Sequence, residues 1–133
     1  MYVSESMWPK VKEGLVETLK TLKVGSATDF DTFMSAVIDR KSFDRVKGYV
    51  DHAKSGKNTK IVSGGTYDDS VGYFIQPTVV QTTDTKDKVF SEEIFGPVVT
   101  AFVYPDAKAR DMLQHVIKDT PYALTGALYS SDQ

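Results

Sequence analysis

Residues 98–104 read Val98-Val99-Thr100-Ala101-Phe102-Val103-Tyr104, an apolar run that does not alternate with polar residues. A continuous run of this kind is typical of a strand that is covered on both faces. Pro105 and Asp106 follow and predict the cap of a helix. The inner stripe of that helix is expected to be Ala109, Met112, Leu113, Val116 and Ile117.

A further strand is expected at residues 125–129, once Thr120 and Pro121 have ended the helix. Strand, helix and strand in this order predict a parallel pair joined by a right-handed crossover. The predicted fold class is therefore α/β, with a largely parallel sheet and flanking helices.

The first half of the chain predicts two amphipathic helices. Between residues 6 and 22 apolar side chains recur every three or four positions, with Ser6 as a plausible N-cap, Pro9 in the first turn and Gly25 as a left-handed stop. Asp39 offers the cap of a second helix that should end near residues 55–56. The side chains that this second helix is expected to turn inward are Phe43, Val46, Val50 and Ala53.

Two shorter strands are expected between the second helix and residue 98. Residues 60–63 form the first and are closed by Gly64 and Gly65, and residues 73–80 form the second. Pro77 cannot donate a ladder hydrogen bond, so it predicts an edge or a bend within that second strand. No repeat or long linker divides the chain, which predicts one segment over residues 1–133.

The composition excludes several classes of function. A 133-residue chain with 41% hydrophobic and 26% charged residues predicts a water-soluble globular domain, with no apolar run long enough to span a membrane. The formal charge of −2 comes from interspersed acids and bases, so neither nucleic acid nor a membrane is an expected partner. Residues 1–8 contain no basic residue and no long apolar stretch, which predicts no secretory signal and does not support a transit peptide.

Side chains suited to metal binding or nucleophilic catalysis are scarce. The sequence has no cysteine, which removes a disulfide framework, a thiolate zinc site and a cysteine nucleophile together. His52 and His115 lie far apart, without acidic or histidine partners at metal-ligand spacing. We therefore predict ordinary helix-flank or surface histidines and no metal site.

Residues 92–97 (EEIFGP) place two acids, an aromatic residue and a Gly-Pro turn directly before the apolar strand. A carboxylate here could accept hydrogen bonds from both hydroxyls of a ribose, and an adjacent aromatic side chain could pack on a planar ring. A purely structural interpretation is also open, in which Glu92 and Glu93 are solvated loop acids and Phe95 fills the core. The residues alone favour the structural interpretation.

The same stretch with Val98 resembles the hallmark motif of the aldehyde dehydrogenase superfamily. By that resemblance Glu93 would bind the nicotinamide ribose of NAD(P) and Phe95 would pack beside the nicotinamide. Residues 72–79 (GYFIQPTV) and 122–127 (YALTGA) resemble two further segments of the superfamily in the same order. The usual glycine is replaced by alanine at position 123, a mild departure that affects no predicted site residue.

Other stretches resemble the pyrroline-5-carboxylate dehydrogenases in particular. These stretches are residues 2–3, 6–15, 33–39 and 68–73. The resemblance implies an NAD-dependent oxidation of L-glutamate 5-semialdehyde to L-glutamate in proline catabolism, a homo-oligomeric enzyme when full-length, and a mitochondrial matrix location. In the superfamily the second helix supplies a glutamine and a lysine to the adenosine ribose, but this sequence has Ser42 and Arg45 there, so neither is predicted as a site residue.

The groups that perform catalysis in that family are missing from this sequence. The resemblance places the nucleophilic cysteine and the Rossmann segment upstream of residue 1 and the substrate-carboxylate loop downstream of residue 133. We therefore expect part of a catalytic domain that has no catalytic residue of its own and binds NAD weakly or not at all in isolation. The alternative is a short non-catalytic product that acts as a binding or subunit-interaction module.

Overall fold

The computed structural model describes residues 1–118, 121–122 and 124–130. Four strands form one sheet in the order β1, β6, β5, β2, with bounds Tyr2–Ser4, Val98–Tyr104, Thr78–Thr82 and Thr59–Ser63. The β6 strand runs parallel to both β1 and β5, and β2 runs antiparallel to β5. The predicted α/β class with a largely parallel sheet is confirmed. A separate antiparallel pair consists of β3 (Tyr67–Asp68) and β4 (Phe74–Ile75).

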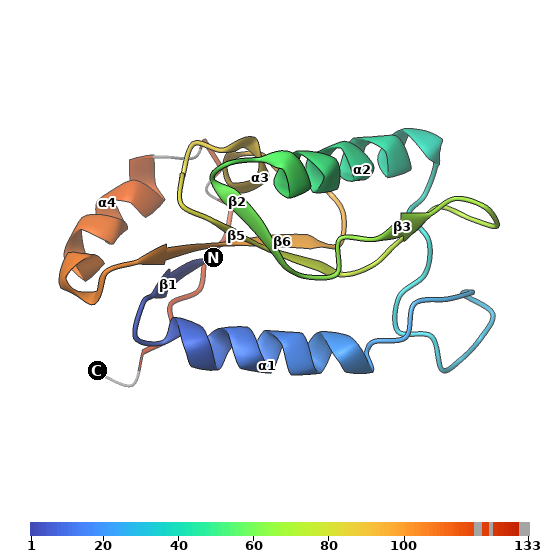
Figure 1. Cartoon of the computed structure of the whole chain (residues 1–133), viewed down its shortest axis with the longest axis horizontal. Coiled ribbons are helices and arrows are strands. Elements are labelled where there is room, and N and C mark those ends of the chain that lie inside the picture. The colour runs from blue at the N-terminus through green and yellow to red at the C-terminus, as the bar shows by residue number, and fades with distance from the viewer. Residues whose placement is uncertain (119–120, 123, 131–133) are drawn as a thin grey trace.

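Helices flank the sheet on both sides (Figure 1). The helix α1 (Trp8–Thr21) runs along one side, and α2 (Arg40–Ser55) with the short α3 (Lys88–Ser91) lies on the other. After β6, a 3-10 turn over Asp106–Lys108 leads into α4 (Ala109–Lys118) at one end of the molecule. No described helix is both long and apolar enough to cross a membrane.

The core lies between α2 and the sheet. All four α2 side chains predicted to face inward are buried, with exposed fractions of 2% or less. Phe43 and Val46 cluster with Ile75 of β4 and Ile94, and Ala53 clusters with Val80 of β5 and Val89 of α3. The Asp39 cap is confirmed, because its Oδ1 accepts the backbone N–H of Ser42 at 2.7 Å. The apolar spacing therefore predicted the buried face of α2 correctly, and the cap predicted where the helix begins.

The predicted ends of the first helix were wrong. Ser6 is not the N-cap: its backbone N–H and its hydroxyl both bind the carboxylate of Asp106, and Met7 occupies the cap position without a side-chain hydrogen bond. Gly25 does not end the helix in a left-handed conformation either, since α1 ends at Thr21 and Leu22 is extended. Long-range partners took the place of the local cap signals, because Ser6 binds Asp106 and the Gly25 N–H binds the Met34 carbonyl.

The strand end at Gly64 and Gly65 and the bend at Pro77 were predicted correctly. Both glycines have positive φ, 76° and 81°, and a Cβ on Gly64 would lie 2.1 Å from the Pro77 carbonyl oxygen. Pro77 separates β4 from β5, so the predicted strand over residues 73–80 is two strands in different sheets. The proline bend therefore moves the chain from one sheet to the other.

The strand predicted at residues 125–129 is absent, and with it the predicted crossover. Both hydrogen-bonding edges of β6 are already occupied by β1 and β5, which leaves no place beside it for another strand. The α4 helix forms, but of its predicted inner stripe only Met112 is buried. Leu113, Val116 and Ile117 are 55%, 43% and 72% exposed, because α4 lies beyond the sheet. Its predicted stop at Thr120 lies outside the described residues.

Candidate functional site

The 92–97 loop follows α3 and leads at Val98 into β6, one of the two inner strands of the sheet. Ile94 is 7% exposed and packs in the core against Phe43 and Val46. Phe95, the next residue, is 76% exposed and has a φ of 53°, in the left-handed region that non-glycine residues rarely adopt. Phe95 is therefore not a core residue, which excludes that part of the structural interpretation.

Both glutamates of the loop are exposed to solvent. The Glu92 carboxylate accepts a hydrogen bond from the Tyr49 hydroxyl, and this bond, followed by burial, raises the pKa of Tyr49 above its ordinary value. Glu93 has no described hydrogen bond or ion pair, so its acceptor oxygens remain open to a ligand. Of the two exposed acids, Glu93 is therefore the one whose carboxylate is not engaged by Tyr49.

Arg45 of α2 holds the backbone of the loop. Its Nε donates to the carbonyl oxygen of Ile94 at 3.2 Å, and a terminal guanidinium nitrogen lies 3.5 Å from the carbonyl oxygen of Phe95. The second contact is long and correspondingly weaker. These bonds provide donors for two loop carbonyls that have no place in the strand ladder.

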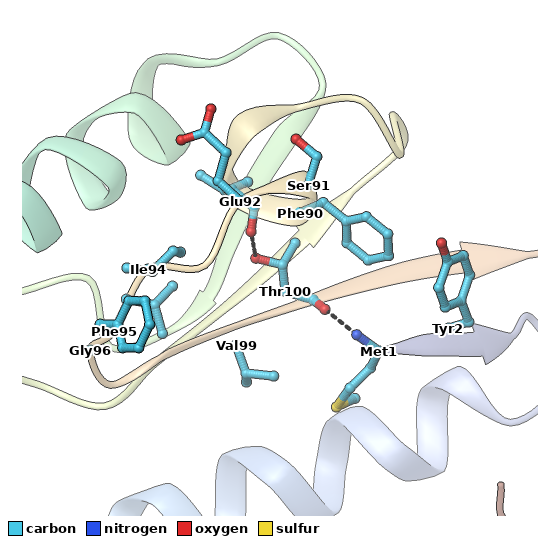
Figure 2. A pocket seen from close by; sticks show the side chains of 12 residues that line it. Met1, Tyr2, Phe90, Ser91, Glu92, Ile94, Phe95, Gly96, Val99 and Thr100 are labelled. Carbon is cyan, nitrogen blue, oxygen red and sulfur yellow. Dashed lines mark hydrogen bonds between the residues drawn. The ribbon is translucent and has the colours of Figure 1, made fainter. Parts of the chain in front are cut away.

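A hollow of about 350 Å³ opens beside the loop (Figure 2). Glu92, Ile94, Phe95 and Gly96 line it from the loop, and Val99 and Thr100 line it from β6. Its far wall is Met1 and Tyr2 of the β1 segment, where the Tyr2 ring meets Phe90 edge-on at 5.1 Å. Rings and backbone line this hollow, so it can receive a planar ring; its carboxylate is that of Glu92, and Glu93 is not among its lining residues.

Two hydrogen bonds of Thr100, one buried and one partly buried, lie at this hollow. The Thr100 hydroxyl donates to the Val89 carbonyl oxygen at 2.6 Å, and the Met1 ammonium donates to the Thr100 carbonyl oxygen at 2.7 Å. Burial lowers the pKa of that ammonium. Thr100 of β6 is thus tied both to α3 and to the start of the chain.

The histidines lie where the sequence predicted, on helices. His52 Nε2 lies 3.0 Å from Asp87, the residue whose carboxylate also caps α3 by accepting the Val89 N–H. In the part of the chain that the structure describes, no group of three or more His, Cys, Asp or Glu side chains could hold a metal ion.

Sequence reasoning missed Arg45 and Tyr49 as parts of this site. Arg45 was expected to be solvated, and it is exposed, but it also binds the loop, and nothing local links position 45 to position 94. The spacing of four residues does place both side chains on one face of α2, but only the packed structure shows that this face meets the loop. Ser42 is the other residue at a position where the superfamily contacts the adenosine ribose. Its backbone N–H donates to the Asp39 cap.

The model of the aldehyde dehydrogenase family matches residues 1–133. The chain belongs to the aldehyde dehydrogenase family. The predicted resemblance to that superfamily is therefore confirmed, and the exposed EEIFGP loop is the motif on which it rested.

Among aldehyde dehydrogenases, the curated relatives include mitochondrial delta-1-pyrroline-5-carboxylate dehydrogenases. Those of Danio rerio and Homo sapiens are each 48% identical over 134 aligned residues, which cover 100% of this chain and 24% of the relative. The chain thus spans about a quarter of the length of these relatives. The predicted similarity to this branch of the family is confirmed as well.

Solved structures agree with the sequence relatives. A delta-pyrroline-5-carboxylate dehydrogenase from Mycobacterium tuberculosis has a TM-score of 0.90 and 34% identity, covering 98% of this chain and 24% of that one. The NAD-bound structure of the M. tuberculosis enzyme has a TM-score of 0.87, with 32% identity over 98% of this chain and 23% of its own. An NAD-bound betaine aldehyde dehydrogenase mutant from Staphylococcus aureus has a TM-score of 0.83 and 32% identity, over 98% of this chain and 27% of its own.

Proposed function

We propose that this chain is part of an NAD-dependent dehydrogenase that oxidises L-glutamate 5-semialdehyde, formed from 1-pyrroline-5-carboxylate, to L-glutamate in proline catabolism. The observation that carries the proposal is the 48% identity to delta-1-pyrroline-5-carboxylate dehydrogenases over the whole chain. NAD is proposed as the cofactor because a structural relative was solved with NAD bound. NAD would supply the acceptor for the hydride that leaves the substrate.

The loop supports a specific role for two residues. Glu93 presents a carboxylate that can accept hydrogen bonds from the two ribose hydroxyls next to the nicotinamide, and Phe95 presents an exposed ring that can pack beside the nicotinamide. The left-handed conformation of Phe95 directs its side chain away from the core, while Ile94 is buried. A hydrogen-bond acceptor beside an exposed ring fits the nicotinamide riboside half of the cofactor.

The remaining groups of the reaction must come from outside these 133 residues. The sequence contains no cysteine to attack the aldehyde, so we propose that the chain acts within a longer subunit and does not catalyse alone. We also propose that this subunit forms homo-oligomers and works in the mitochondrial matrix, as the names of the mitochondrial relatives suggest for the organelle.

The test is a chimera in which this segment replaces the aligned quarter of the human relative. We expect NAD reduction that depends on glutamate semialdehyde. The Glu93→Gln variant should raise the KM for NAD or slow hydride transfer, with an unchanged circular dichroism spectrum. A chimera that folds but does not oxidise glutamate semialdehyde contradicts the proposed substrate, and unchanged kinetics in Glu93→Gln contradict the role of Glu93.

An intact-mass measurement separates this proposal from a non-catalytic short product. Native material recovered with an antibody against this chain should be several times larger than 14.7 kDa. A native species near 14.7 kDa would instead favour the binding or subunit-interaction module.

A further inference from the structure

Arg45 and Tyr49 lie one helical turn apart on α2, and both reach the 92–97 loop. Arg45 binds the carbonyl oxygen of Ile94, and the Tyr49 hydroxyl binds the carboxylate of Glu92. The residues on either side of Glu93 are therefore both tied to the same face of one helix. We propose that Arg45 and Tyr49 are positioning residues that orient Glu93 toward the cofactor, an inference that rests on the proposed function.

The loop needs such support because its conformation is unfavourable by itself. Phe95 is the only non-glycine residue with positive φ in the described part of the chain. A non-glycine residue stays in this region when its surroundings hold it there, and such residues cluster at binding sites. Ile94 anchors the loop by packing its side chain on Phe43 and Val46 of α2. Arg45 of the same helix binds the backbone, at the carbonyl groups that flank the left-handed residue.

The chemistry of arginine suits this task. Its planar guanidinium has several fixed N–H donors and can serve two neighbouring carbonyl oxygens at once, whereas an ammonium group is a single point donor. The family resemblance implies a lysine at this position that touches the adenosine ribose. Here the guanidinium contacts the loop backbone instead. The arginine at position 45 therefore acts on the cofactor through the loop rather than directly.

Hydrogen exchange in the chimera, without added NAD, tests the contact between α2 and the loop. In Arg45→Met, we expect the backbone amides of residues 92–98 to exchange about tenfold faster or more, because a charge-assisted hydrogen bond is lost. Tyr49→Phe removes one hydroxyl and should accelerate exchange mainly at residues 92–93. Lys41→Met, an exposed basic residue on the same helix, is the matched control and should leave the loop unchanged. Loop exchange within twofold of wild type in both Arg45→Met and Tyr49→Phe overturns the inference.

NAD binding in the chimera tests whether Arg45 and Tyr49 orient Glu93 toward the cofactor. We expect Arg45→Met to weaken NAD binding about tenfold while the KM for the aldehyde stays within twofold, with Arg45→Lys recovering part of the affinity. If Glu93→Gln weakens NAD binding but Arg45→Met and Tyr49→Phe do not, the positioning role is overturned and the proposed function stands. If Glu93→Gln also leaves NAD binding unchanged, the proposed role of Glu93 fails, and the positioning role fails with it.

Discussion

Gly96 lies against Val46 so closely that a Cβ on Gly96 would be 2.5 Å from Cγ2 of Val46. Both residues belong to the contact between the loop and α2. Gly96→Ala should destabilise the chain by about 1–3 kcal/mol through overpacking and should displace the loop. The measurement is urea unfolding, with Gly14→Ala as a control, since a Cβ there meets nothing within 4 Å.

A double variant tests whether the contact with Val46 causes the loss of stability in Gly96→Ala. Val46→Ala removes the methyl groups that the new Cβ would meet, so the two substitutions together should cost less than the sum of their separate effects. Strict additivity would show that Gly96 is required for a reason other than this contact.

Phe95→Ala should change the free energy of unfolding by only about 0.5 kcal/mol, because the side chain is 76% exposed and leaves no cavity. Phe95→Gly should be more stable than Phe95→Ala by about 1 kcal/mol, since glycine adopts the left-handed conformation without a Cβ penalty. Chemical denaturation ranks the two variants. A loss of several kcal/mol in Phe95→Ala would mean that the ring is buried.

Asp87 joins α3 to α2, because its carboxylate accepts the Val89 N–H at 3.0 Å and also lies 3.0 Å from His52 Nε2. Asp87→Ala should therefore destabilise the chain by about 1–2 kcal/mol, the usual range for loss of an N-cap. His52→Ala should cost less, because the cap remains. Thermal unfolding of both variants checks the order, and an equal loss in both would assign the effect to the histidine contact alone.

The Asp39 cap predicts a specific pH dependence. The backbone N–H of Ser42, the largest contribution, holds the pKa of Asp39 below its ordinary value of 3.8. A depressed carboxyl pKa contributes stability that is present above the unfolded pKa and lost as the pH falls through the folded pKa. Wild type should therefore exceed Asp39→Ala in unfolding midpoint at pH 7, and this difference should shrink below about pH 4. Asp39→Asn retains the cap, and its advantage over Asp39→Ala should not depend on pH in this range.

Polar substitutions on the α4 stripe should leave the fold intact. Leu113 and Ile117 are 55% and 72% exposed, so Leu113→Gln with Ile117→Gln should not lower the unfolding midpoint and should reduce self-association of the isolated chain. Sedimentation velocity and thermal unfolding provide both readouts. Phe43→Ala, at a core position, is the contrasting variant and should cost about 3–5 kcal/mol. A large loss in the double glutamine variant would place the stripe in the core.

Sequence patterns predicted the elements whose signals are local. The α2 helix has a strong apolar period and an aspartate cap, and both are found as predicted. The bounds of β6 agree with the predicted run over residues 98–104, although only Thr100 and Ala101 are buried in it. The failures occur where a long-range partner competes with a local signal, as when Asp106 binds Ser6 across 100 residues of sequence.

For the site, the amino-acid sequence by itself determined the chemistry: a carboxylate and an aromatic ring next to a Gly-Pro turn, in a chain with no cysteine. It also identified the family, because a motif is recognised from the order of its residues, whatever conformation they adopt. Only the tertiary structure decided which side chain of the loop is buried and which is exposed, since Ile94 and Phe95 are neighbours of similar hydrophobicity. That choice depends on α2, whose Val46 and Arg45 contact the loop from about 50 positions earlier in the chain, and such contacts exist only after the helix has packed on the sheet.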